Sequence, residues 1–93
     1  MMGFDIRLHP NAVKFLKGLD KDTGVRIKSA LRNLENDPFR KRSKADIKKL
    51  EGTKGREDLY RLRIGDYRAV YAVEGNTVWV TEIFLRGKGY RDI

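Results

Sequence analysis

Three arginines in one short segment are the residues whose type and spacing point most clearly to chemistry. The segment Leu59 to Tyr71 reads LYRLRIGDYRAVY and is rich in β-branched and aromatic residues, with Gly65-Asp66 near its centre. This pattern predicts a β-hairpin with a glycine-first turn of type II′. If the residues that flank the turn pair with each other, Arg63 lies directly opposite Arg68, and Arg61 lies on the same face of the hairpin.

The other face of this hairpin is apolar, so the arginines are expected on the face that no helix covers. The residues expected on the core side are Tyr60, Leu62, Ile64, Tyr67, Ala69, Tyr71 and Val73. Like charges directly across a ladder destabilise it, so a bound anion is the expected compensation. The planar guanidinium fork matches phosphate oxygens in pairs. The alternative is an ordinary solvated face, on which water and salt screen the charges.

The last hairpin decides whether a fourth arginine joins this face. A two-residue loop at Gly75-Asn76 would turn Trp79 toward the arginines and drive Glu82 and Arg86 into the core. Burying an unpaired charge is costly, so we expect a three-residue loop that starts one residue earlier and contains a bulge. That register places Trp79 in the core, Arg86 on the arginine face, and Glu82 across from Arg68.

Two helices are expected before these strands. Residues 4–8 alternate as a half-buried strand does, and Pro10-Asn11 opens a first helix. Asp22 or Thr23 is expected to cap a second helix, which residues 36–38 end. The apolar stripes are Ala12, Phe15, Leu16 and Leu19 in the first helix, and Ile27, Ala30, Leu31 and Leu34 in the second.

The remaining segments complete an α+β fold of order β-α-α-β-β-β-β. A basic loop over residues 40–49 leads into a short strand at Ile47 to Leu50, a turn follows at Gly52 to Gly55, and three strands are expected between Leu59 and Leu85. The helices cover one face of a mainly antiparallel sheet, and the other face stays open. Residues 1–93 form a single domain, and no helix is expected at the C-terminus because residues 86–93 are few and contain two glycines.

The charge balance favours a polyanionic partner. Lysine and arginine number 21 against 13 acidic residues, which gives a net charge of +8. Both helices are expected to pack their apolar stripes against the core, so neither has an apolar face left to bind a membrane. Nucleic acid is therefore favoured over a membrane surface. Improved solubility is the simpler explanation for the excess of lysine. The lysines expected to contact RNA are Lys44, Lys48, Lys49, Lys54 and Lys88.

Several residue types that serve catalysis are missing or isolated. The chain has no cysteine and no apolar run long enough to span a bilayer, so a cytoplasmic protein without disulfides is expected. No cluster of histidines and carboxylates has the spacing of a metal site, so neither a metal nor a cofactor is expected. The single histidine, His9, follows the first strand and is interpreted as a surface or capping residue.

Taken together, these segments resemble the RelE/ParE toxin superfamily, and the RelE branch in particular. The resemblance rests on the element order, the segment KLEG at 49–52, the arginine-rich run 59–71, and a closing arginine and tyrosine, Arg86 and Tyr90. It covers nearly the whole chain.

The resemblance implies a toxin of a type II toxin-antitoxin system that cleaves mRNA in the ribosomal A site, with a RelB-like antitoxin as partner. The reaction is attack of a ribose 2′-OH on the adjacent phosphate, which leaves a cyclic phosphate and a free 5′-OH. The implied catalytic residues are Arg61 and Arg63 beside the scissile phosphate, Arg68 on the phosphate, Arg86 at the transition state, and Tyr90 beside the reacting ribose.

Two questions stay open at this stage. Some family members carry lysine where this chain has Arg61 and Arg63, and arginine cannot act as a base because it does not lose its proton. Tyr90 or Lys88 could move the proton, or catalysis could be mainly positional and electrostatic. The alternative functions are a ParE-like toxin that inhibits a topoisomerase by protein contact, and a basic RNA-binding module without catalysis.

Overall fold

A computed structural model of the chain describes residues 3–50 and 58–87. The expected order of elements is confirmed. The elements are β1 (Asp5–Leu8), α1 (Pro10–Lys17), α2 (Lys21–Arg32), a short 3₁₀ helix η1 (Asn33–Glu35), β2 (Asp46–Lys49), β3 (Leu59–Ile64), β4 (Tyr67–Glu74) and β5 (Thr77–Leu85). The predicted turn at Gly52 to Gly55 and the prediction of no C-terminal helix lie outside the described residues.

Side chains that precede each helix set where it begins. The His9 ring accepts the Asn11 backbone N–H at 3.1 Å and caps α1, which confirms its interpretation as a capping residue. The Asp20 carboxylate caps α2 by accepting the Thr23 N–H at 3.1 Å. The prediction of a cap at Asp22 or Thr23 was therefore wrong. The first turn of α2 is polar and faces solvent, so the apolar stripe starts later than the helix does.

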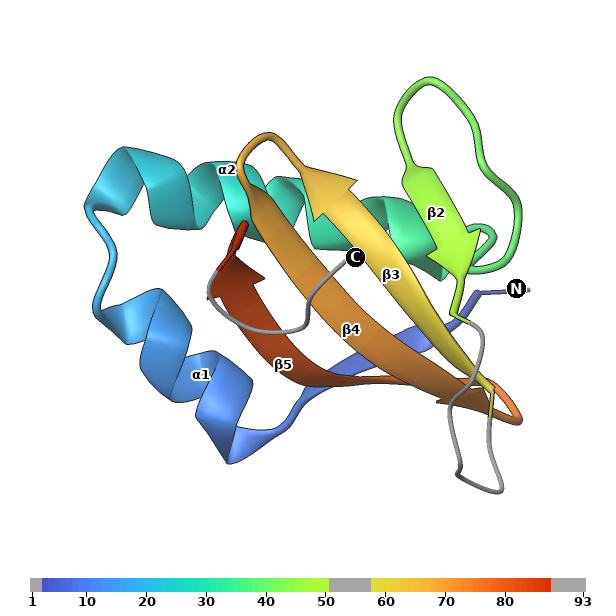
Figure 1. The fold of residues 1–93 in the computed structure, drawn as a ribbon. Helices are drawn as coiled ribbons and strands as arrows, with labels where there is room; N and C mark the ends of the chain where they lie inside the picture. Colours follow the sequence, from blue (N-terminus) through green and yellow to red (C-terminus); the bar gives the residue numbers. More distant parts are fainter. Residues whose placement is uncertain (1–2, 51–57, 88–93) are drawn as a thin grey trace.

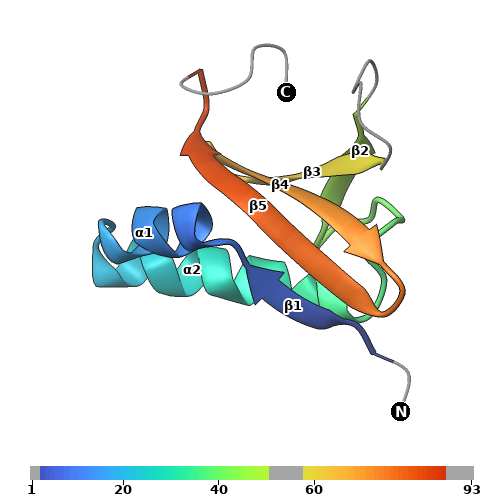
Figure 2. The same ribbon diagram turned by 90° about the horizontal axis from the view of Figure 1, so that it is seen from below.

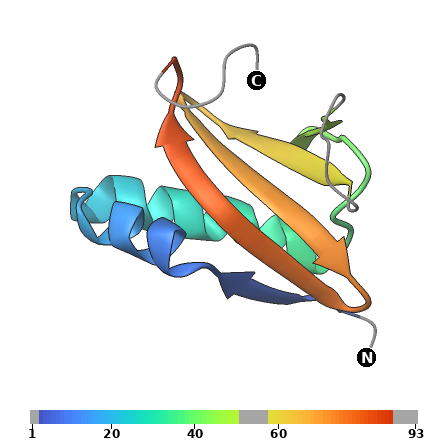
Figure 3. The same ribbon diagram turned by 60° about the horizontal axis from the view of Figure 1, so that its bottom comes forward.

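All five strands form one sheet in the order β1-β5-β4-β3-β2. Strands β2 to β5 pair antiparallel with their neighbours, whereas β1 pairs parallel with β5, so that Asp5 lies beside Thr77 and Leu8 beside Val80. The first strand of the chain thus lies next to the last, as the blue and red ribbons show (Figure 1). Figure 3 shows β1 beside the half of β5 that follows the turn from β4.

Both α-helices lie on one side of this sheet, as expected (Figure 2). Their apolar stripes pack against the inward-facing residues of the central strands. The fully or nearly buried members of this core include Ala12, Leu16, Ile27, Leu31, Leu34, Ile47, Leu62, Ile64, Ala69, Tyr71, Val78, Val80 and Ile83. The opposite face of β3, β4 and β5 is left without a helix in the described chain.

Tyr71 ties the loop after the helices to the sheet. Its side chain is fully buried, stacks on the Tyr60 ring at a centroid distance of 5.6 Å, and donates its hydroxyl to the Pro38 carbonyl at 2.7 Å. Burial raises the pKa of the Tyr71 phenol above its ordinary value of 10.0. The folded state therefore keeps the phenol protonated when the unfolded chain would ionise it.

We expect Tyr71→Phe to lower the free energy of unfolding by about 1–2 kcal/mol at pH 8, because the Pro38 carbonyl loses its buried donor. Since the folded-state pKa is raised, the contribution of Tyr71 is complete below the unfolded pKa, near 10, and is lost progressively above it. The difference in free energy of unfolding between wild type and Tyr71→Phe, measured by urea unfolding, should thus become smaller from pH 8 to pH 11.

Two glycines are expected to respond in opposite ways to alanine. Gly24 lies inside α2 and a Cβ there would meet no atom within 4 Å, so Gly24→Ala should stabilise the protein by about 1 kcal/mol. Gly65 has a φ of +60°, so Gly65→Ala should destabilise it by about 1–2 kcal/mol. Thermal or urea unfolding measures both. A loss of stability in Gly24→Ala would contradict the assigned position of this residue in the helix.

Candidate functional site

The arginine hairpin has the register that the sequence predicts. Ile64 pairs with Tyr67 around the turn, Arg63 lies directly opposite Arg68, and Arg61 lies opposite Val70. Alternate residues of these strands belong to the core, so the three arginines share the face that points away from the helices. Three positive groups are thus held on one patch of two neighbouring strands.

A carboxylate on β2 holds the Arg61 side chain. Only 9% of Arg61 is exposed, and its Nη2 atom lies 3.2 Å from Oδ1 of Asp46. Lys41 Nζ approaches the same oxygen at 3.7 Å. Within the described residues, the Nε atom of Arg61 is buried and has no hydrogen-bond partner. A buried N–H without an acceptor is costly, and an anion bound at this face would supply one.

Asp46 was not among the residues singled out from the sequence. It pairs with Arg63 across β2 and β3, which places its side chain on the arginine face. The signal was present in the sequence: Ile47 must face the core, so its neighbour Asp46 must face the other way. What could not be read from the sequence is which strand lies beside β3, since residues 51–57 separate β2 from it.

Arg68 lies beneath the cluster and braces the hairpin turn. It is only 4% exposed, and its Nη1 donates to the carbonyls of Gly65 and Tyr67, both at 2.9 Å. Burial lowers the pKa of Arg68, and the charges of Arg63, Arg61 and Arg86 lower it further, while Asp46 acts in the opposite direction. The charges of the other three arginines therefore all act on Arg68.

Arg86 follows β5 and is exposed. Its backbone N–H donates to the Asp66 carbonyl at 2.6 Å, which ties the end of β5 to the tip of the arginine hairpin. This contact explains why the fourth arginine reaches the cluster. The expectation that Arg86 joins the arginine face is consistent with its influence on Arg68.

The register that places Arg86 differs from the predicted one. The loop between β4 and β5 has two residues, Gly75 and Asn76, and Glu74 pairs directly with Thr77, so the three-residue loop was wrong. The side of the sheet to which alternate residues of β5 point changes instead at a bulge between β4 and β5. Val70 pairs with Glu82 and Tyr71 with Val80, which leaves Thr81 as the extra residue.

This bulge divides β5 into two halves with opposite parity. Beyond it, Ile83 faces the core and Glu82 the arginine face as expected, but Glu82 lies opposite Val70, and it is Phe84 that lies opposite Arg68. Before it, Val80 is fully buried in the core and Trp79 lies opposite Ala72 on the arginine face, 40% exposed. The predicted position of Trp79 in the core was therefore wrong. A loop would have changed the parity of the whole strand, whereas the bulge changes only its second half.

Among the described lysines that were expected to bind RNA, the register places Lys48 on the arginine face. Lys48 pairs with Arg61 and shares the arginine face, whereas Lys49 lies opposite Tyr60 and forms an exposed ion pair with Asp58 at 3.3 Å. Lys44 is exposed in the loop before β2. Lys54, Lys88 and Tyr90, also expected at the site, lie outside the described residues.

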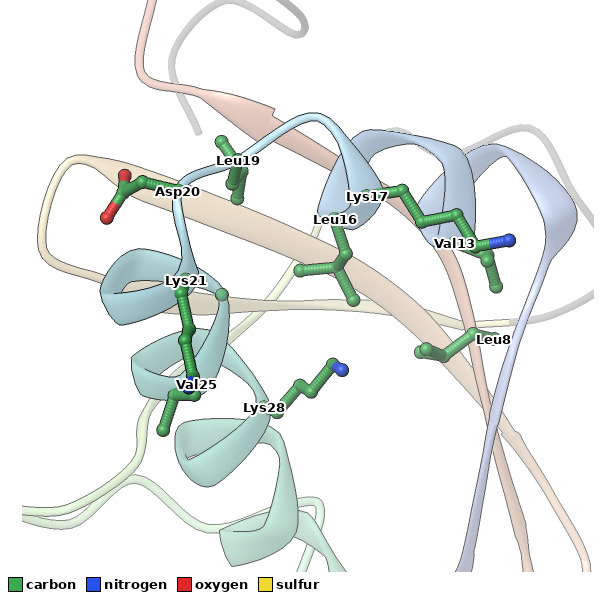
Figure 4. A pocket seen from close by; sticks show the side chains of 10 residues that line it. Leu8, Val13, Leu16, Lys17, Leu19, Asp20, Lys21, Val25 and Lys28 are labelled. Atoms are coloured by element: carbon green, nitrogen blue, oxygen red, sulfur yellow. The ribbon is translucent and has the colours of Figure 1, made fainter.

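Other parts of the described chain offer no alternative centre with catalytic groups. A pocket of about 430 Å³ lies between α1 and α2 (Figure 4), and both helices lie on the side of the sheet opposite the arginine face (Figure 2). Leucines form its floor, Lys17, Lys21 and Lys28 lie around it, and its carboxylate, Asp20, caps α2. In residues 3–50 and 58–87, no group of three His, Cys, Asp or Glu side chains could hold a metal ion, and no helix is long and apolar enough to cross a membrane.

Comparison with known proteins identifies the family to which this arrangement belongs. A profile of the family described as "ParE toxin of type II toxin-antitoxin system, parDE" matches residues 6–90. A protein named RelE1 from Methanocaldococcus jannaschii is 31% identical over 93 residues, which are 98% of this chain and 99% of the relative. The chain belongs to the RelE/ParE toxin superfamily.

Solved structures of RelE proteins share the fold of this family member. The archaeal RelE–RelB complex from Pyrococcus horikoshii OT3 matches at 35% identity with a TM-score of 0.76, over 96% of this chain and 100% of the other. The RelB–RelE complex from Methanococcus jannaschii matches at 28% identity with a TM-score of 0.69, over 94% and 98% of the two chains. The resemblance seen in the sequence is therefore confirmed.

Proposed function

We propose that this RelE/ParE family member is a toxin of a type II toxin-antitoxin system that cleaves mRNA on the ribosome. The single observation that carries the proposal is the placing of Arg61, Arg63 and Arg68 on the face that no described helix covers, where the buried Nε of Arg61 lacks an acceptor within the described residues. A phosphodiester supplies both the negative charge and the acceptor oxygens that such a face needs.

The proposed chemistry is attack of a ribose 2′-OH on the adjacent phosphorus. The bond from phosphorus to the 5′ oxygen breaks, and the products are a cyclic phosphate and a free 5′-OH. Arg63 and Arg86 are exposed and are assigned direct contact with the phosphate oxygens. Preorganised cations stabilise the charge that develops on the phosphorane, and this electrostatic effect is worth most where water is excluded.

The two buried arginines are assigned supporting roles. Asp46 orients Arg61, and the Nε–H of Arg61, which lacks an acceptor among the described residues, is assigned to a phosphate oxygen. Arg68 adds positive potential beneath the site while it braces the turn. None of the arginines can accept the 2′-OH proton. The described residues thus supply positioning and electrostatic stabilisation, and Tyr90 or Lys88 is assigned the proton transfer.

We propose a RelB-like antitoxin as the partner, because the solved relatives were crystallised as RelE–RelB complexes. Val70 and Phe84, the apolar residues of β4 and β5 that face the arginines, are buried and offer no exposed strip to such a partner. The pocket between α1 and α2, with its leucine floor and surrounding lysines, offers an alternative surface for an acidic amphipathic segment (Figure 4).

Mapping of mRNA ends on translating ribosomes tests the proposed reaction. The chain is added to a purified translation system, with and without its antitoxin, and new 5′-OH ends are located. Cuts in the A-site codon that the antitoxin suppresses are expected, and the site of action in the cell is then the cytoplasm. The absence of cuts in a preparation that arrests growth would reject the proposal.

The family profile carries the name ParE, which favours a topoisomerase inhibitor as the second candidate. In that case growth arrest would occur with intact mRNA and altered DNA supercoiling. If neither effect is seen but RNA binds with a strong salt dependence, the chain is a binding module without catalysis.

A further inference from the structure

A second hollow on the arginine face contains the exposed Trp79. This pocket measures about 270 Å³ and is lined by His9, Ala72, Glu74, Trp79 and Thr81. It lies toward the β1 end of the sheet, because Trp79 pairs with Arg7 of β1 on one side and with Ala72 of β4 on the other. No residue of this pocket takes part in the arginine cluster described above.

The fold builds the pocket from the two features of β5 that the sequence did not predict. The two-residue turn and the bulge at Thr81 together place the indole on the uncovered face. Directly opposite the indole stands Ala72, whose small side chain leaves room beside the ring. Glu74 is the diagonal neighbour of Trp79, at about 7–8 Å, within reach of a long side chain.

The polar groups around the indole have fixed hydrogen-bonding roles. His9 Nδ1 accepts the Asn11 N–H at 3.1 Å, so the neutral ring carries its proton on Nε2 and offers a donor. The Thr81 hydroxyl donates to the Val70 carbonyl at 3.2 Å, which leaves its oxygen as an acceptor. The ionised Glu74 carboxylate only accepts. The pocket therefore presents a flat aromatic ring, one donor and two acceptors.

We propose that this pocket binds a guanine base of single-stranded RNA, an inference that rests on the proposed function. The base stacks on the Trp79 indole, as bases do on aromatic platforms. Guanine presents two donors, N1–H and N2–H, to the Glu74 carboxylate and one acceptor, O6, to the His9 N–H. Adenine places an acceptor, N1, where guanine has a donor, and the carboxylate repels it.

The position of the pocket relative to the arginines sets which nucleotide it reads. Phe84, opposite Arg68, and Trp79 are five residues apart on β5, or about 15 Å at the rise of a strand. This span is too long for the base attached to the scissile phosphate. The pocket therefore reads a guanine a few nucleotides away along the strand, and Arg7, on the side of Trp79 away from the cluster, is placed to meet the backbone beyond that base.

A nucleobase fits this pocket better than an apolar side chain of a protein does. A leucine or phenylalanine seated on the indole would remove water from His9 and Glu74 without giving them partners, and unpaired polar groups are costly when buried. A base with both donors and acceptors on its edge satisfies them. The pocket also lies on the same face as the four arginines.

Intrinsic fluorescence tests the proposal directly, because Trp79 is the single tryptophan of the chain. The purified full chain is titrated with GMP and, separately, with AMP in the absence of ribosomes. We expect saturable quenching by both, with GMP bound about tenfold more tightly or better. Glu74→Gln should abolish this preference, whereas the matched control Glu82→Gln, on the same face but outside the pocket, should retain it.

Calorimetry of Trp79 variants completes the test. Trp79→Ala should weaken GMP binding about tenfold or more, and Trp79→Phe should restore most of it. Equal affinity for GMP and AMP, or no quenching by either, would overturn the proposal. So would a change in Trp79 fluorescence that only a protein partner produces, which would assign the pocket to that protein. These readouts use no ribosome, so they fail independently of the mRNA cleavage that tests the proposed function.

Discussion

Replacing Arg86 with alanine is expected to slow mRNA cleavage on ribosomes by about 100- to 1,000-fold while leaving the melting temperature unchanged. A preorganised group that stabilises transition-state charge is typically worth this much. The side chain is exposed, and the hydrogen bond to the Asp66 carbonyl is made by the backbone N–H, which alanine retains. The measurement is the single-turnover rate of 5′-OH end formation at a defined A-site codon.

Arg32→Ala is the matched control for this variant. Arg32 is an exposed arginine in the last turn of α2, so its removal changes the net charge equally without touching the arginine face. It should leave the rate within about twofold. Equal losses in the two variants would show that general attraction to RNA, and not the arginine cluster, drives activity. Arg68→Ala is a poorer probe, because the Arg68 side chain also braces the hairpin turn.

Asp46→Ala is expected to have the largest effect on stability at the site, with a loss of about 2–3 kcal/mol. Removing one partner of a buried ion pair leaves the other charge without compensation, and the loss falls below that of a fully buried pair because the Asp46 side chain is 33% exposed. Cleavage should fall as well, since Arg61 loses its orientation. Asp46→Asn keeps one acceptor oxygen, so it should lose less stability and less cleavage activity than Asp46→Ala.

Asp58→Ala supplies the comparison for Asp46→Ala. Its ion pair with Lys49 is exposed on both sides, so its loss should cost less than about 0.5 kcal/mol. Inorganic phosphate should raise the melting temperature of Asp46→Ala more than that of wild type, because the anion replaces the missing carboxylate. If phosphate stabilises neither protein, the face is not an anion site.

The arginine hairpin was predictable because local rules determine it. The turn at Gly65 fixes which residues pair, and the pairing fixes which side chains share a face. The core side of the hairpin and the helix stripes followed from the same alternation of apolar residues. The N-terminus of α2 was misplaced because a solvent-facing first turn carries no apolar signal.

The bulge at Thr81 was not predictable from the same rules. The rule that charged side chains avoid the core predicted the arginine face for Glu82 and Arg86. Either a longer loop or a bulge within the strand can satisfy that rule. We predicted the longer loop, whereas the structure has the bulge. The residues between the turn and the bulge were therefore assigned to the wrong faces. Asp46 was missed for a different reason, since its contact with Arg61 joins residues from two strands that a long connection separates.

The parallel pairing of β1 with β5 has a consequence for synthesis of the protein. The sheet cannot be completed until the last strand has emerged, because β1 waits for a neighbour some seventy residues later in the chain. The sheet of the nascent chain therefore stays incomplete until β5 has been synthesised. Arg86 comes directly after that strand, so the arginine face cannot be assembled before nearly all the described residues have been made.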